Sequence, residues 1–185
     1  KLIQTHISYV FLTGNDAYKI KKHRNFGFLD FSSLEKREFY CKEEVRLNAR
    51  AAPAYYLGVL AIAKDPTDHF HFAGNDAKEE VVEYCVHMKQ FPSGQLFSER
   101  LKNGQLDLGH MVALGRKVAQ FHARCATNEK ILSFGTVPVV RRAYDENYAQ
   151  TEKYIAPGIQ TRQQLDETRK YTGQLLFDQA TLVSK

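Results

Sequence analysis

The residues of this sequence with the clearest capacity for chemistry are two lysines on a short predicted strand. In Ala17-Tyr18-Lys19, strand alternation places Ala17 and Lys19 on one face and Tyr18 on the other. A lysine held on a strand can neutralise and position the phosphates of ATP, and the small Ala17 beside it leaves room for adenine. Lys21 shares the Lys19 face and is the alternative phosphate ligand. The interpretation without chemistry is a solvated, basic edge strand.

A glutamate on the helix that follows could hold the lysine in place. Glu43 lies one helical turn from both Phe39 and Leu47, so it borders the apolar stripe expected to pack on a sheet. We expect its carboxylate to turn toward Lys19, and we expect Glu44, one position further round the helix, to be solvated. A strand lysine followed by a helix glutamate favours a nucleotide site over a solvated strand.

A short segment after the last predicted strand could contact the base of the nucleotide. In a two-lobed nucleotide site, the linker between the lobes offers backbone N–H and C=O groups to adenine, and apolar side chains enclose the ring. Here the strand predicted over residues 80–88 leads directly to Pro92 and Gly94, where we expect the boundary between two lobes. The linker residues expected at the adenine are Met88, Lys89, Gln90 and Phe91.

The pattern of residues 1–91 predicts a small α+β lobe. Apolar and polar residues alternate over residues 3–11 and 17–22 with turn residues between them, which predicts a hairpin. Ser32-Ser-Leu-Glu35 is typical of a capping box, here for a helix that runs to about residue 50. Three further strands are expected over residues 57–64, 69–72 and 80–88. The prediction is an antiparallel five-stranded lobe with one helix.

From residue 92 onward the period becomes helical, which predicts the first part of a second, helical lobe over residues 92–185. A short helix is expected to end at Gly104, and Asp107 is expected to cap a longer one. Residues 127–140 are expected as a loop. Two more helices are expected over residues 144–154 and 161–177, the second with a capping box.

Composition restricts the class of protein. With 185 residues, 43% of them hydrophobic, the chain can form one domain or two small lobes with cores. No apolar run approaches the roughly 20 residues of a membrane helix, so no membrane partner is expected. Cys41, Cys85 and Cys125 are widely spaced in apolar surroundings, which favours reduced thiols in a cytoplasmic protein over a disulfide or metal site. The net charge of +5 is modest, so a nucleic-acid surface along residues 19–24 is the minor alternative.

Four segments together resemble the aminoglycoside phosphotransferase family. They are Thr-Gly-Asn-Asp-Ala-Tyr-Lys-Ile-Lys-Lys at residues 13–22, the predicted helix and its lead-in at residues 27–48, Val-His-Met-Lys-Gln-Phe-Pro at residues 86–92, and Leu-Gly-Arg-Lys-Val-Ala-Gln-Phe-His-Ala at residues 114–123. The likeness is nearest to a bacterial branch in which such a domain precedes a P-loop kinase-like domain. It implies a protein-kinase-like fold, ATP and magnesium as cofactors, and a small-molecule hydroxyl as acceptor. It also implies that Lys19 is the phosphate-binding lysine, Glu43 its helix partner, and Met88 to Phe91 the hinge.

The sequence departs from the family pattern in two ways. Its phosphate loop holds only Gly14, and it has no His-Gly-Asp catalytic loop or following metal-binding aspartate. Because the chain starts at Lys1 without a methionine and stops soon after a helical pattern, we expect an N-terminal fragment whose parent supplies the magnesium ligands. No catalytic or metal-binding residue is assigned, and these residues alone are expected to be inactive. The alternative is a non-catalytic pseudo-kinase or regulatory nucleotide-binding module.

Overall fold

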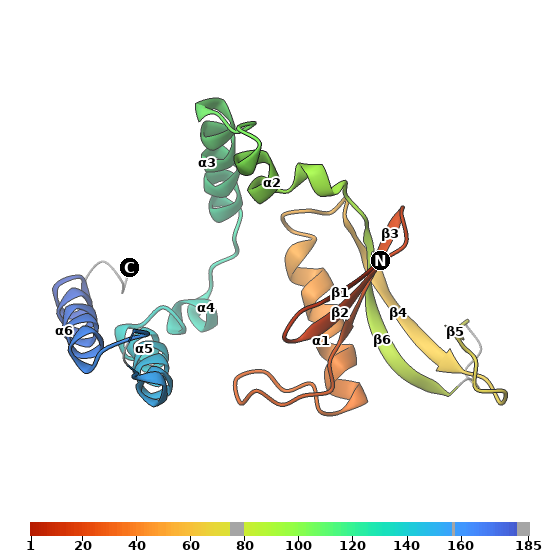
Figure 1. The fold of residues 1–185 in the computed structure, drawn as a ribbon, viewed down its shortest axis with the longest axis horizontal. Coiled ribbons are helices and arrows are strands. Elements are labelled where there is room, and N and C mark those ends of the chain that lie inside the picture. Colours follow the sequence, from red (N-terminus) through yellow and green to blue (C-terminus); the bar gives the residue numbers. More distant parts are fainter. Residues whose placement is uncertain (75–79, 157, 181–185) are drawn as a thin grey trace. The chain divides into compact units, whose positions relative to one another are not determined.

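The computed structural model describes residues 1–74, 80–156 and 158–180 (Figure 1). The chain forms two compact units, Lys1–Phe121 and His122–Lys185. The first, here called the sheet unit, contains the sheet and the helix that packs on it. The second, here called the helical unit, is formed by helices in its described part.

The described strands of the sheet unit form one antiparallel sheet of six strands in the order β1-β2-β3-β6-β4-β5. Helix α1 (Leu34–Asn48) packs against β6 and β4, and Figure 1 shows it along one face of the sheet. The predicted α+β class is therefore confirmed. The strands are β1 (Leu2–Gln4), β2 (Ser8–Leu12), β3 (Asp16–Lys21), β4 (Tyr56–Lys64), β5 (Phe70–Phe72) and β6 (Val81–Lys89).

The sheet has one strand more than the sequence predicts, because the strand predicted over residues 3–11 is two strands. The Thr5 hydroxyl accepts hydrogen bonds from the backbone N–H groups of Ile7 (3.3 Å) and Ser8 (2.9 Å). This turn reverses the chain, so that Leu2 lies opposite Phe11. Apolar and polar residues keep alternating through the turn, so the pattern alone gave no sign of it.

Helix α1 begins one residue later than the predicted capping box. Ser33 is the N-cap, and its hydroxyl accepts a hydrogen bond from the Lys36 N–H. Ser32 instead donates its own backbone N–H to the Asp30 carboxylate. The helix thus starts at the residue after Ser32, whose backbone N–H is already bonded to Asp30.

The core beneath α1 contains two of the three cysteines. The side chains of Cys41, Cys85, Phe31 and Val86 are fully buried. Neither of these two cysteines forms a disulfide. Burial raises the pKa of Cys41 to about 12 and the pKa of Cys85 to about 11. Both thiols are therefore protonated at neutral pH, as expected for core cysteines, whereas Cys125 is half-buried.

Helical structure begins shortly after the sheet ends at Lys89. A 3-10 turn (Ser93–Gln95), α2 (Phe97–Lys102) and α3 (Leu108–Ala123) follow β6. The change of secondary structure thus occurs where the sequence predicts it, while the division into lobes of residues 1–91 and 92–185 stays a prediction. No helix among the described residues has the length and apolar character needed to cross a membrane.

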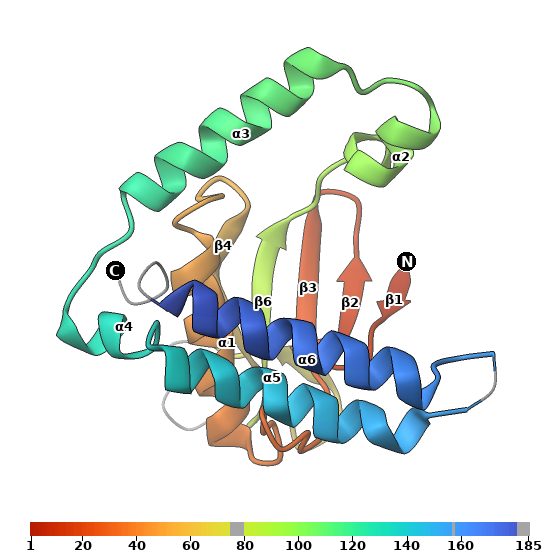
Figure 2. The ribbon, with the colours of Figure 1, turned by 90° about the vertical axis from the view of Figure 1, so that its left-hand side faces the viewer.

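The helical unit contains two paired helices, α5 (Val137–Thr151) and α6 (Arg162–Asp178), which lie side by side in Figure 2. The Tyr148 hydroxyl joins them by donating to the Thr168 carbonyl at 2.9 Å. The predicted capping box of Thr161 and Gln164 is confirmed at the start of α6. The loop predicted over residues 127–140 is wrong, because the Asn128 side chain caps a short helix, α4 (Glu129–Ser133), and α5 begins at Val137.

Candidate functional site

A cavity of about 520 Å³ lies between strand β3 and helix α1. We call it the α1 cavity, and its volume is in the range of about 300–1,000 Å³ that is usual for small-molecule sites. Its charged lining comes from two adjacent elements of the sheet unit, with apolar side chains around it. Residues that line it include Lys19, Lys21, Glu43, Glu44, Phe39 and Tyr56.

Strand β3 presents its two lysines to this cavity because alternate side chains of a strand share a face. Lys19 lies opposite Val10 of β2 and Val86 of β6, so its strand is paired with a neighbour on both sides. Tyr18 points to the other face, where its ring stacks on His87 with centroids 5.0 Å apart and planes 8° apart. The predicted face of Lys19 and Lys21 is therefore confirmed, and the strand is an inner one.

Both lysines bind one carboxylate of α1. Lys19 Nζ lies 2.8 Å from Glu44 Oε1, and Lys21 Nζ lies 2.7 Å from Glu44 Oε2. The side chains of Lys19, Lys21 and Glu44 are 24%, 5% and 13% exposed. We call these three residues the Glu44 cluster. Two ammonium groups on one carboxylate leave one positive charge in excess within this cluster, whereas Glu43, which also lines the cavity, is paired with Arg46.

The pKa of Glu44 is lower than its ordinary value of 4.5. Burial on its own would raise this pKa, but the hydrogen bonds from Lys19 and Lys21 outweigh the effect of burial. The carboxylate is therefore ionised at neutral pH and holds both ammonium groups in fixed positions.

The predicted contact between Lys19 and Glu43 is wrong. Glu43 binds Arg46 of its own helix, at 2.8 Å from Nε and 2.6 Å from Nη2, and lies at the outer side of the cavity. The reason lies in the helix face that packs on the sheet. Phe39 and Leu47, which share the Glu43 row, are 57% and 45% exposed.

The buried row of α1 contains Arg37, Cys41 and Glu44, spaced four and three residues apart. The Arg37 guanidinium binds Glu83 of β6 at 2.8 Å and donates to the Phe31 carbonyl. Two of the three residues in this row are charged, so hydrophobic periodicity could not reveal it. The signal that could have found it is charge pairing, since each charged residue has an opposite charge on a predicted strand.

The residues predicted to contact adenine do not line the α1 cavity. Ala17 is buried and lies opposite Met88, which also lies opposite Tyr56 of β4. The Gly14 N–H donates to the Gln90 side chain at 3.0 Å, so the β2–β3 turn is tied to the predicted linker. Gly14 has a φ of 108°, which favours glycine. Strand pairing of Ala17 with Met88 thus joins the strand that carries Lys19 to the start of the predicted linker.

The backbone of the predicted linker is partly occupied by bonds within the protein. The Lys89 N–H donates to the Tyr55 carbonyl at 2.8 Å, and the Gln90 N–H donates to the Asn15 carbonyl at 2.8 Å. Among the described residues, no hydrogen bond is formed by the Phe91 N–H. If the linker donates a backbone hydrogen bond to a base, Phe91 is the residue available for it.

No magnesium ligand is assigned among the residues that the structure describes. Magnesium in phosphotransferases is held by carboxylate or amide oxygens together with the substrate phosphates. No group of three or more His, Cys, Asp or Glu side chains that could hold a metal ion occurs in residues 1–74, 80–156 and 158–180. No chemical step through a metal is therefore assigned to these residues.

The chain is similar to proteins of unassigned function from mycobacteria. It is 33% identical over 147 residues to uncharacterized proteins of Mycobacterium bovis and of two strains of Mycobacterium tuberculosis. The match covers 80% of this chain and 27% of each relative, so this chain spans about a quarter of their length. No model of a known protein family matches the chain. No solved structure matches it.

Proposed function

We propose that this chain is the nucleotide-binding part of an ATP-dependent phosphotransferase that acts on a small-molecule hydroxyl, with a protein-kinase-like fold. The observation that supports this most directly is the Glu44 cluster, in which a lysine on an inner strand is held by a helix carboxylate at a cavity. The resemblance to the aminoglycoside phosphotransferase family supports the same function. The acceptor, magnesium and an attached P-loop domain are proposals about the whole protein.

In this proposal, the excess positive charge of the Glu44 cluster binds the phosphates of ATP. Lys19 contacts them, and Glu44 fixes its ammonium group in advance, which lowers the entropic cost of binding. Lys21 is almost fully buried against Glu44 and lies 5.1 Å from the Phe31 ring centroid, so it supports the carboxylate from within. The adenine lies near Ala17 and the linker of Met88, Lys89, Gln90 and Phe91, with the Phe91 N–H as donor. Glu43 has no role at the phosphates.

Calorimetric titration of the full-length protein with ATP and Mg²⁺ tests the proposal. Lys19→Ala is expected to weaken ATP binding about tenfold or more, because a charge-assisted contact to phosphate is lost. Lys102→Ala is the matched control, since Lys102 is an exposed lysine of α2 outside the cavity. Equal affinities of the wild type and the Lys19 variant would refute the phosphate assignment.

Turnover separates the enzyme from its alternative, a non-catalytic nucleotide-binding module. The full-length protein is given ATP, Mg²⁺ and a panel of small hydroxyl compounds, and ADP release is measured. Acceptor-dependent release that decreases in the Lys19 variant supports the phosphotransferase. ATP binding with no acceptor-dependent release supports the regulatory module.

We also propose a cytoplasmic location, supported by the two buried, protonated thiols.

A further inference from the structure

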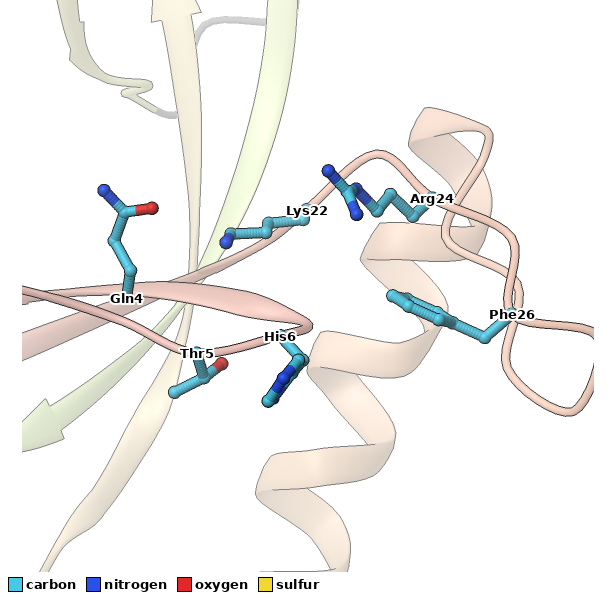
Figure 3. A pocket seen from close by; sticks show the side chains of 6 residues that line it. All are labelled: Gln4, Thr5, His6, Lys22, Arg24 and Phe26. Carbon is cyan, nitrogen blue, oxygen red and sulfur yellow. The ribbon is translucent and has the colours of Figure 1, made fainter. Parts of the chain in front are cut away.

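A second cavity, of about 330 Å³, lies where the β1–β2 turn meets the segment that follows β3. We call it the Arg24 cavity. Figure 3 shows the side chains of Lys22, Arg24 and Phe26 extending from that segment toward the turn that carries Thr5 and His6. Its lining residues are Gln4, Thr5, His6, Lys22, Arg24 and Phe26.

The cations of the Arg24 cavity have no counter-charge in the part of the chain that the structure describes. No carboxylate lines the cavity, and neither Lys22 nor Arg24 forms an ion pair with any residue that the structure describes. Lys22 Nζ lies 4.7 Å from the centroid of the Tyr9 ring, a cation–π contact that orients the ammonium group without neutralising it. By contrast, Lys19 and Lys21 share a carboxylate. The cavity therefore attracts an anion.

The Arg24 cavity is separate from the α1 cavity. The two share no lining residue. Tyr9 lies opposite Ile20 in the β2–β3 pairing, and Ile20 points to the face of β3 that is opposite to Lys19. Since Lys22 lies over Tyr9, its ammonium group is on that other face. An anion bound here is therefore a different ligand group from one bound at Lys19, and the inference does not depend on the proposed nucleotide site.

We propose that the Arg24 cavity binds the phosphate group of a small phosphomonoester. The guanidinium of Arg24 and the ammonium group of Lys22 match the two negative charges of the phosphate, and His6 adds a ring N–H. The Thr5 hydroxyl is used in the turn, so it holds the wall in shape. The Phe26 ring offers a flat apolar surface for the organic part of the ligand.

A nucleic acid fits this cavity less well than a small molecule. Binding of single strands uses a groove that follows the backbone over several nucleotides, with a row of cations and stacking rings. Here two permanent cations and one lining aromatic ring surround a single cavity. The geometry matches one phosphate group and the atoms attached to it.

Titration of the full-length protein with phenyl phosphate and with inorganic phosphate tests this inference. Both should bind, and phenyl phosphate should bind more tightly because its ring can contact Phe26. Lys22→Gln and Arg24→Gln should each weaken both ligands about tenfold or more. Lys102→Gln removes the same charge away from the cavity and should change neither. Phe26→Ala should weaken phenyl phosphate and leave inorganic phosphate unchanged. Circular dichroism establishes that each variant is folded.

Three results would overturn the inference. The first is the absence of saturable phenyl phosphate binding to the wild type. The second is an equal effect of the Lys22, Arg24 and Lys102 substitutions, which would indicate general charge attraction. The third is an oligonucleotide that binds through Lys22 and Arg24, more tightly with length and with a steep salt dependence, which would identify a nucleic-acid surface. Loss of ATP binding in the Lys19 variant leaves this inference unaffected.

Discussion

Replacing Glu44 by glutamine removes the only counter-charge that the described residues give to Lys19 and Lys21. Lys21 is 5% exposed and cannot regain hydration without displacing the helix. Removing one partner of a buried ion pair costs about 3–5 kcal/mol, and the remaining amide oxygen can still accept one hydrogen bond, so we expect a loss of about 2–3 kcal/mol. Glu43→Gln breaks an exposed pair with Arg46 and should have little effect on stability.

Equilibrium urea unfolding at pH 7 measures both variants. For a slope of about 1–3 kcal/mol per molar urea, the Glu44 variant should unfold at a midpoint about 1 M lower than the wild type. The midpoint of the Glu43 variant should hardly move. The double variant Lys21→Met/Glu44→Gln should be more stable than Glu44→Gln alone, because it no longer contains the unpaired buried cation. Equal losses for the two glutamate variants would show that the Glu44 cluster does not anchor the helix.

The pH dependence provides an independent check on the same carboxylate. The pKa of Glu44 in the folded protein lies below its ordinary value of 4.5, so its ionised form is favoured by folding. Its contribution to stability is therefore complete above pH 4.5 and is lost as the pH falls through the lower, folded-state pKa. The Glu44→Gln variant should lose less stability than the wild type in this acidic range. A parallel decline in both proteins would contradict the assigned ion pairs.

Two further predictions concern the helix cap and the thiols. Ser33→Ala should lower the free energy of unfolding by about 1 kcal/mol, because Ser33 caps α1. Ser32→Ala should have a much smaller effect. Thermal unfolding measures both variants, and equal shifts would reject Ser33 as the cap. In the native protein at pH 8, a thiol reagent should modify Cys125 before Cys41 and Cys85. The reason is that burial raises the pKa of Cys41 to about 12 and the pKa of Cys85 to about 11. Mass spectrometry after brief labelling identifies the modified sites, and early labelling of Cys41 would contradict its burial.

The sequence predicted most strands and α1 correctly, because alternation and capping are local properties of the chain. The strand predicted over residues 57–64 begins one residue later than β4, and the strand predicted over residues 80–88 is shifted by one residue at both ends relative to β6. The turn at Thr5 was not predicted, because a threonine hydroxyl that binds backbone N–H groups leaves the alternation of apolar and polar residues intact. The partner of Lys19 was predicted wrongly for a different reason. Glu43 and Glu44 are 100° apart on a helix, and only the face that packs on the sheet decides between them.

Ion pairs join that face to the sheet at two points. At one end of α1, Arg37 binds Glu83 of β6 at 2.8 Å, and toward the other end Glu44 binds the two lysines of β3. The small thiol of Cys41 is fully buried between them. An aromatic residue such as Phe39, which periodicity selects for the core, lies outside this contact. In the proposed function, a phosphate at Lys19 would bind the ammonium group that Glu44 holds in place. The same carboxylate would then both orient the phosphate-binding lysine and anchor α1 to β3.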